Sequence, residues 1–385
     1  MVSKRFILKR LLLLVPVLLG VATFVFVILH LSPGDPARLI LGQRAPESQV
    51  RQLRRDLGLT KPLFVQYVDF LTDAVQFNFG ESYQVAQGNS VRSVLVDRLP
   101  VTLELALYGQ LIGILLGIPV GIVSAIKQDT IVDHVGRIGA LSGISIPIYW
   151  SGPLLILAFS TYLGIFPASG RIGSTIFLDN RWLPFTFLPP DTYLPALWFE
   201  VYDFGLAGVS VPVPFFEVIR ITSQTSWPLT GMLTVDTLLL GNVSAWQSAV
   251  MHMFLPAVTI GIYSMALISR MMRSSMLEVV RQDYMRTARA KGQGARITIM
   301  KHGFRNALIP VVTVIGIQFG GLLGGAVLTE TVFGIGGIGT LIVAAIGAND
   351  YPVVQGTVLT FALLFTLVNL GVDITYSYLD PRIQQ

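Results

Sequence analysis

Arg286-Thr287-Ala288-Arg289-Ala290-Lys291-Gly292 lies in a short polar region between two long apolar segments of the chain. This polar region, residues 276–306, contains seven lysine and arginine residues but only two acidic residues. Short loops that are this basic stay on the cytoplasmic side of a membrane. The sequence therefore predicts a cytoplasmic loop between two membrane spans.

The composition agrees with a membrane protein. The 385 residues are 52% hydrophobic and 13% charged, whereas soluble domains have about 25% charged residues. The formal charge of +5 does not indicate nucleic-acid binding, because the basic residues gather in particular loops. The chain has no cysteine, which excludes disulfides and thiolate chemistry.

Six segments are long and apolar enough to cross a bilayer, for which a helix needs about 20 apolar residues. The first is too long for the apolar core of a signal peptide, about 7–15 residues, so we expect it to remain in the chain. An even number of spans returns the C-terminus to the side of the basic N-terminus, which we expect to be cytoplasmic. The chain is thus predicted to be an all-α polytopic membrane protein with spans at 9–31, 101–126, 138–163, 249–268 (running on to 276), 307–329 and 352–376.

This topology divides the chain into residues 1–31, the outer segment 32–98 and the five-span core 99–385. In the outer segment we expect a helix at 46–57 and a second helix that begins after Pro62. The second helix places apolar side chains on one face with a period of 3.6 residues: Leu63, Tyr67, Phe70, Leu71, Ala74 and Val75. Such a face must be buried, either as a structural cap on the core or in contact with a delivered substrate.

Glycines recur every four residues in two spans. This spacing places them along one helix face, where another backbone can approach closely. The two spans are therefore expected in the interior of the protein, and Pro119 and Pro147 are expected to kink their own spans. Close packing alone explains the pattern, and a seam that slides during transport is the alternative. The glycines are Gly109, Gly113, Gly117 and Gly121 in the second span, and Gly316, Gly320 and Gly324 in the fifth.

Ionisable residues within spans are costly and often functional. Glu104, Glu330 and Asp373 lie near span ends, and we expect none of them at mid-depth. This argues against a secondary transporter driven by an ion gradient, which usually needs such a group near the midplane. We expect no metal site and no catalytic group. The glycine run 334–339 is only a weak match to a dinucleotide fingerprint, and the phosphate loop G-x-x-x-x-G-K-[ST] is absent from the sequence.

The region from 286 to Pro310 resembles the cytoplasmic "EAA" coupling loop of permease subunits in ABC-type importers, in the version of the dipeptide and oligopeptide subfamily. Arg286 and Thr287 stand where the motif's eponymous Glu and Ala would be, as is usual in that subfamily. Three further motifs are similar to the same family and fall in the right order. They are Ser-Pro-Gly-Asp-Pro at 32–36, Phe-Gly-Glu-Ser at 79–82 and Thr-Glu-Thr-Val-Phe-Gly at 329–334.

The resemblance implies a type I ABC importer permease fold in the cytoplasmic (inner) membrane. It implies assembly with a second homologous permease, two ABC ATPase subunits and an extracytoplasmic substrate-binding protein. ATP and Mg²⁺ would be used by the ATPases, and this chain would bind no cofactor. The small residues Ala288 and Gly292 would let the ATPase reach the corner of the loop. The implied coupling residues are Arg286, Thr287, Ala288, Arg289, Lys291 and Gly292.

Permeases of this subfamily have a short loop after the third span, so residues 171–240 are expected to be an extracytoplasmic insertion. It contains Trp182, Trp198 and Trp227 and is rich in proline. It is either an ordered outer lid or a docking surface for the binding protein. Short peptides are the expected cargo, and nickel complexes, glutathione and oligosaccharides remain alternatives. A gradient-driven transporter and a membrane enzyme are the competing classes.

Overall fold

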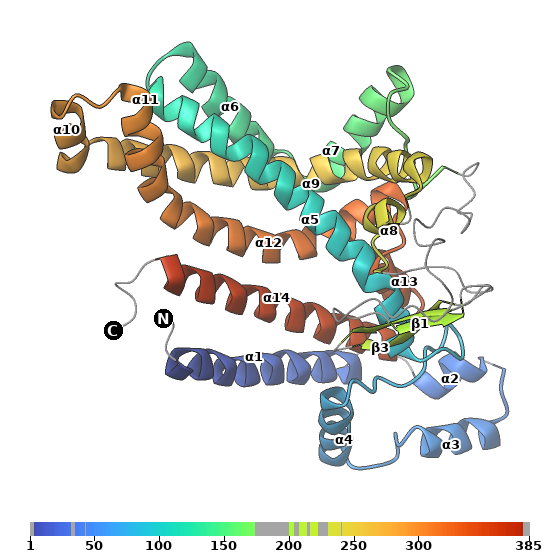
Figure 1. Cartoon of the computed structure of the whole chain (residues 1–385). Coiled ribbons are helices and arrows are strands. Elements are labelled where there is room, and N and C mark those ends of the chain that lie inside the picture. The colour runs from blue at the N-terminus through green and yellow to red at the C-terminus, as the bar shows by residue number, and fades with distance from the viewer. Residues whose placement is uncertain are drawn as a thin grey trace.

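The computed structural model describes residues 4–31, 35–42, 44–173, 200–203, 208–213, 216–221, 230–239 and 241–379. Their order in the chain is shown in Figure 1. The first elements are α1 (Lys4–Leu31), α2 (Pro36–Leu41), α3 (Glu47–Asp56), α4 (Leu63–Val75), α5 (Val91–Ile126), α6 (Ile131–Ser145), α7 (Ile148–Leu155) and the π-helix η1 (Ile156–Tyr162). The strands β1 (Glu200–Asp203), β2 (Gly208–Val213) and β3 (Phe216–Ile221) and the helix α8 (Leu233–Leu239) follow. The chain continues through α9 (Val243–Val280), α10 (Asp283–Ala290), α11 (Ala295–Ile297), the π-helix η4 (Thr298–Phe304), α12 (Arg305–Phe333), α13 (Ile338–Gly347) and α14 (Tyr351–Leu379).

Five helices among these residues are long and apolar enough to cross a membrane. They are α1, α5, α9, the continuous helix Ala295–Phe333 and α14. The expected third span is different. It is two helices, Ile131–Ser145 and Ile148–Tyr162, that meet at an angle of 107°. Pro147 explains the break, because proline disfavours the helical conformation of the residue before it, and Ile146 is extended (φ −84°, ψ 119°). The number of spans is six if this bent pair counts as one.

The two ends of the molecule carry different elements (Figure 1). The start of α1 and the end of α14 lie at the same end as α10 and α11, which we call the α10 end. The helices α2, α3, α8 and α13 and the strands lie at the opposite end, which we call the α13 end. An ion pair joins α1 to α14 toward the α10 end, between Arg10 and Asp373 (2.9 Å).

The glycines of α5 form a seam with α9. A Cβ added to any of the four glycines from Gly109 to Gly121 would lie within 3.0 Å of an α9 side chain. The α9 partners are also four residues apart, so rows of the same spacing interlock on both helices, which gives strongly crossed axes. The partners, in order, are Ile260, Ser264, Ile268 and Met272.

The three glycines that the sequence singles out in α12 differ in their contacts. Gly316 and Gly320 contact α14, because added Cβ atoms would collide with Val372 and Phe365. Gly324 has no atom within 4 Å of that position, so no contact within the described chain accounts for it, and its packing role stays a prediction. Each step of four residues turns a straight helix by about 40°, so the row rotates away from its partner.

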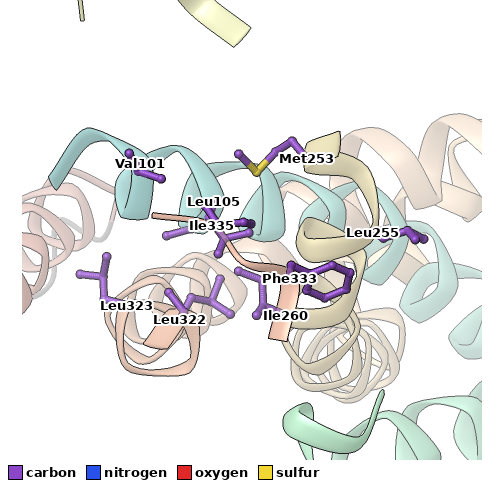
Figure 2. Close-up of a cluster of buried hydrophobic side chains, with 11 residues drawn as sticks. Val101, Leu105, Met253, Leu255, Ile260, Leu322, Leu323, Phe333 and Ile335 are labelled. Atoms are coloured by element: carbon purple, nitrogen blue, oxygen red, sulfur yellow. The ribbon is translucent and has the colours of Figure 1, made fainter. Parts of the chain in front are cut away.

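The hydrophobic core lies where α5, α9 and α12 meet, toward the α13 end. Figure 2 shows Leu105 of α5, Ile260 of α9 and Phe333 of α12 in one cluster, together with Ile335 from the turn after α12. These four side chains are at most 1% exposed. The cluster fixes the three longest helical elements relative to one another.

The seam gives a first prediction. Leucine at Gly117 is expected to lower the free energy of unfolding by about 1–3 kcal/mol, because an overpacked interface forces neighbours to shift. Leucine at Gly139 of α6 is the matched control, since it also replaces a helical glycine but meets no atom within 4 Å. Thermal unfolding in detergent measures both variants. Equal midpoints for the two would contradict close packing at this seam.

Outside the core, the expected helices at 46–57 and after Pro62 are α3 and α4. Tyr67 of α4 faces α1, where its hydroxyl lies 2.6 Å from that of Thr23, and its ring lies edge-on to Phe26. Leu63 and Val75 are exposed, so the expected apolar face is narrower than its periodicity indicates.

The segment 171–240 adds a small sheet to the otherwise helical fold. The strands β1, β2 and β3 pair in sequence order and antiparallel, with Ser210 opposite both Glu200 and Arg220. The sequence did not indicate this sheet. Trp182, Trp198 and Trp227 lie outside the described residues.

Candidate functional site

The basic loop begins with a break in the chain. The sequence favours one helix from 276 to 291, but α9 ends at Val280 and α10 begins at Asp283. Gln282 between them is extended (φ −69°, ψ 150°). The expectation of one continuous helix is therefore wrong, and the break turns α10 away from the axis of α9 (Figure 1).

Gly292 ends α10. Its φ of +78° lies in the left-handed region, which glycine adopts without steric cost. The N–H of Gly292 donates to the carbonyl of Arg289 (3.0 Å), and the N–H of Gln293 donates to that of Ala288 (3.3 Å). This is the Schellman pattern of a helix C-terminus, so the corner is a defined turn.

The loop has one side against the protein and one side exposed. Met285 and Ala288 are buried against the chain itself, and a Cβ on Gly303 of η4 would lie 3.3 Å from the Met285 methyl group. Gly292 has no neighbour within 4 Å of its Cβ position. The exposed residues include Arg286, Thr287, Arg289, Lys291, Arg296 and Lys301.

The observed corner of the loop differs from the expected one. Ala288 and Gly292 were expected to form one small-residue surface for a partner, but Ala288 faces the interior. Only Gly292 leaves open space outside the chain. Three cations of the expected set, Arg286, Arg289 and Lys291, are exposed in the same loop.

Hydrogen bonds fasten α10 to the helix that follows. The amide of Asn306 donates to the Tyr284 hydroxyl (3.2 Å), and His302 Nε2 lies 2.9 Å from the side-chain oxygen of Gln293. The segments α11, η4 and α12 form one helix, Ala295–Phe333. The loop is therefore continuous with a spanning helix.

A buried ion pair joins α6 to α9. Asp133 is fully buried and accepts two hydrogen bonds from the guanidinium of Arg273, each of 2.7 Å. Arg137 lies 3.8 Å from the same carboxylate. Two parallel bonds fix the orientation of both groups. The sequence analysis did not single out any of these residues.

Two carboxylates organise the α13 end. Glu104 of α5 accepts from Arg171 (2.9 Å) and from the N–H and hydroxyl of Thr234 (2.7 and 2.6 Å). It thereby holds both ends of the segment 171–240. Glu330 of α12 accepts from the hydroxyl of Thr102 (2.5 Å) and the N–H of Thr340 (3.0 Å).

The glycine run 334–339 makes room for Glu330. A Cβ at Gly337 or Gly339 would lie within 3 Å of its carboxylate. These glycines therefore let the carboxylate reach the start of α13, where free N–H groups favour an anion. The run is a packed turn at a helix end.

A third carboxylate, Asp350, binds the segment 82–85 at the same end of the molecule. Burial alone would raise its pKa, but hydrogen bonds from the Ser82 hydroxyl (2.6 Å) and from the N–H groups of Val85, Gln84 and Tyr83 outweigh burial. The pKa of Asp350 is therefore below its ordinary value. This group adds stability above its unfolded pKa and loses it as the pH falls through the folded pKa.

The described chain is thus a bundle of apolar helices with an exposed basic loop that continues into a spanning helix. Comparison with known proteins gives the family. The N-terminal family of binding-protein-dependent transport system membrane components matches residues 3–106, and the family of inner membrane components of these systems matches residues 117–385. The chain belongs to this family of inner membrane components.

Individual relatives agree along nearly the whole chain. The dipeptide transport system permease protein DppB of Alkalihalophilus pseudofirmus is 38% identical over 376 residues, which covers 98% of each chain. The di/tripeptide permease DppB of Pseudomonas aeruginosa is 39% identical over 381 residues, again 98% of each. The glutathione permease GsiC of Salmonella choleraesuis is 35% identical over 379 residues, 98% of each.

Proposed function

We propose that this chain is one of two permease subunits that form the pathway of an ATP-driven importer for short peptides. The observation that carries this proposal is the loop 283–304, exposed on one side and continuous with a spanning helix. Such a loop suits the transfer of motion from a separate engine to the pathway. The peptide-transport names of similar proteins supply the substrate class.

The proposed engine is a pair of ABC ATPase subunits on the cytoplasmic side. The sequence has no phosphate loop of its own, so the nucleotide and Mg²⁺ would bind the partners. The basic loop, with its exposed cations, lies at the α10 end of the molecule, as do the start of α1 and the end of α14. The positive charge of the loop favours a cytoplasmic position for this end.

In this mechanism, closure of the ATPases around ATP displaces the corner at Gly292. The contacts of α10 with η4 pass the displacement to α12. The glycine seam brings α5 and α9 into close contact, and a sliding of this seam would change the relative position of the two helices. The α13 end would then face the extracytoplasmic binding protein.

Uptake by the reconstituted complex tests the proposal. Proteoliposomes are prepared with both permeases, the ATPases and the binding protein. They are expected to accumulate a labelled dipeptide only when ATP and Mg²⁺ are present on the side of the membrane where the ATPases lie. Ionophores that collapse ion gradients should leave uptake unchanged. Uptake that survives without ATP and stops with the ionophores would favour the gradient-driven alternative.

A panel of competing solutes addresses the cargo. Unlabelled dipeptides are expected to inhibit uptake of the labelled dipeptide more strongly than glutathione, nickel complexes or oligosaccharides do. The order of inhibition at equal concentration is the measurement. Stronger inhibition by glutathione would assign the transporter to the chemistry of the glutathione relative instead.

A further inference from the structure

Arg270 is an arginine on the open face of a spanning helix. It lies on α9 within the span Val243–Val280 and is exposed in the chain. It forms no ion pair or hydrogen bond with any described residue. One turn further along, Arg273 has a carboxylate partner in Asp133, so Arg270 is the arginine of this pair that has none.

Arg270 lines a cavity between α9 and α12. The cavity has a volume of about 410 Å³, within the range of roughly 300–1,000 Å³ for small-molecule sites. Its polar groups are Arg270, Ser274 and Gln318. The remaining walls are Leu267, Met271, Val314 and Ile317.

The cavity is an open depression on the face of the chain, and it lies about midway along the helices that line it. Gln318 is 13 residues from the start of α12 and 15 from its end, which places it about 20 Å from either end. Arg270 is 10 residues, or about 15 Å, from the end of α9. The cavity is therefore about halfway along α12, at a depth where a free charge is expensive.

Lipid is an unsuitable neighbour for this face. Arginine in a span normally faces a partner or a water-filled cavity. The same side of α12 has a second unusual feature, because Gly321 and Gly324 are exposed beyond Ile317 and have no atom near their Cβ positions. The unpaired charge of Arg270 favours a surface that water and a passing solute can reach, and the two glycines leave space beside it.

We propose that Arg270 binds the α-carboxylate of a peptide as it passes between the two permeases, with Gln318 and Ser274 as additional hydrogen-bond partners. This inference rests on the proposed function. The guanidinium matches a carboxylate in charge and in planar geometry. The apolar remainder of the cavity leaves the peptide side chain without a specific partner, which suits passage of many sequences.

The test compares variants in the reconstituted complex. Arg270→Gln removes the charge and Arg270→Lys keeps it without the planar fork. Arg55→Gln on α3 is the control, because Arg55 is also exposed but lies away from the spans. Initial uptake rates are measured for Ala-Ala and for Ala-Ala-amide, which lacks the carboxylate.

Arg270→Gln is expected to reduce uptake of Ala-Ala about tenfold, as for loss of a charge-assisted hydrogen bond, with the lysine variant in between. The ratio of the free to the amidated peptide should fall relative to the wild type. The binding protein is the same throughout, so its own preference cancels in this comparison.

Three outcomes would overturn the inference. Arg270→Gln could import Ala-Ala at the wild-type rate, it could lose both peptides by the same factor, or it could fail to copurify with the second permease. The last result would make Arg270 a contact between subunits. Failure of the wild type to import any peptide would overturn the proposed function itself.

Discussion

Replacing Gly292 with tryptophan is expected to reduce ATP-driven uptake at least tenfold while the chain stays in the membrane and in the complex. Two physical effects act together. A non-glycine residue in the left-handed conformation costs about 1–2 kcal/mol, which disturbs the turn that ends α10. The large ring also fills the open space at Gly292, where no part of the described chain lies and where the proposed ATPase contact occurs.

Two matched variants separate these effects. Gly292→Asn introduces a small residue that tolerates the left-handed region, so this variant should retain most of the uptake. Gly88→Trp has the same type of backbone (φ +76°) and the same open space, but it lies in the outer segment, so transport should change little. Uptake and ATPase rates in proteoliposomes are the readouts. Normal coupling in Gly292→Trp, with all subunits present, would rule out this corner as the contact.

The second large effect is expected at Asp133. Alanine at this position leaves the guanidinium of Arg273 without its partner in a mostly buried site, where its side chain is 20% exposed. Breaking a buried pair in this way costs about 3–5 kcal/mol. The midpoint of thermal unfolding in detergent should fall by several degrees, because the pair joins α6 to α9.

Two further variants test this explanation. Asp283→Ala removes an exposed pair with Arg286, whose side chains are 98% and 80% exposed, and such pairs contribute at most about 1 kcal/mol. The double variant Asp133→Leu with Arg273→Met should recover much of the loss, since it removes both charges. If the double variant is as unstable as Asp133→Ala, the unpaired charge is not the cause.

Five of the expected spans are found as single helices because long apolar runs dominate all local preferences. The third was expected as one span at 138–163 because its composition is apolar throughout. An apolar composition does not predict where a helix bends, and in the structure the bend lies at Pro147. A local kink was expected at Pro147, whereas the observed angle is 107°. Here α6 packs against α9, and α7 packs against α9 and α12, and these contacts are not visible in the local sequence.

The functional residues were harder to predict. The fourth span was expected at 249–268, running on to 276, but Arg270 and Arg273 were not included among the ionisable residues of the spans. The continued helical spacing of Met271, Met272 and Met276 was the available signal. Local sequence patterns could not predict the ion pair between Asp133 and Arg273, because the two residues are 140 positions apart in the chain.

The prediction of the basic loop 276–306 has the same limit. The motif at 286–292 located the exposed loop, and glycine at 292 indicated a helix end. Which side of α10 faces its own chain depends on the contact between Met285 and Gly303. That contact turns Ala288 inward, and spacing alone could not reveal it.

The central claim is that the corner at Gly292 touches a separate ATPase. The chain has no cysteine, so Lys291→Cys gives a single reactive thiol at this exposed corner. In the assembled, transporting complex, a short crosslinker with a maleimide at one end and an amine-reactive ester at the other is expected to link this thiol to a lysine of an ATPase subunit. The same thiol should be protected from a bulky maleimide. A thiol that stays fully reactive and forms no link to an ATPase, in a complex that still imports peptide, would contradict the account.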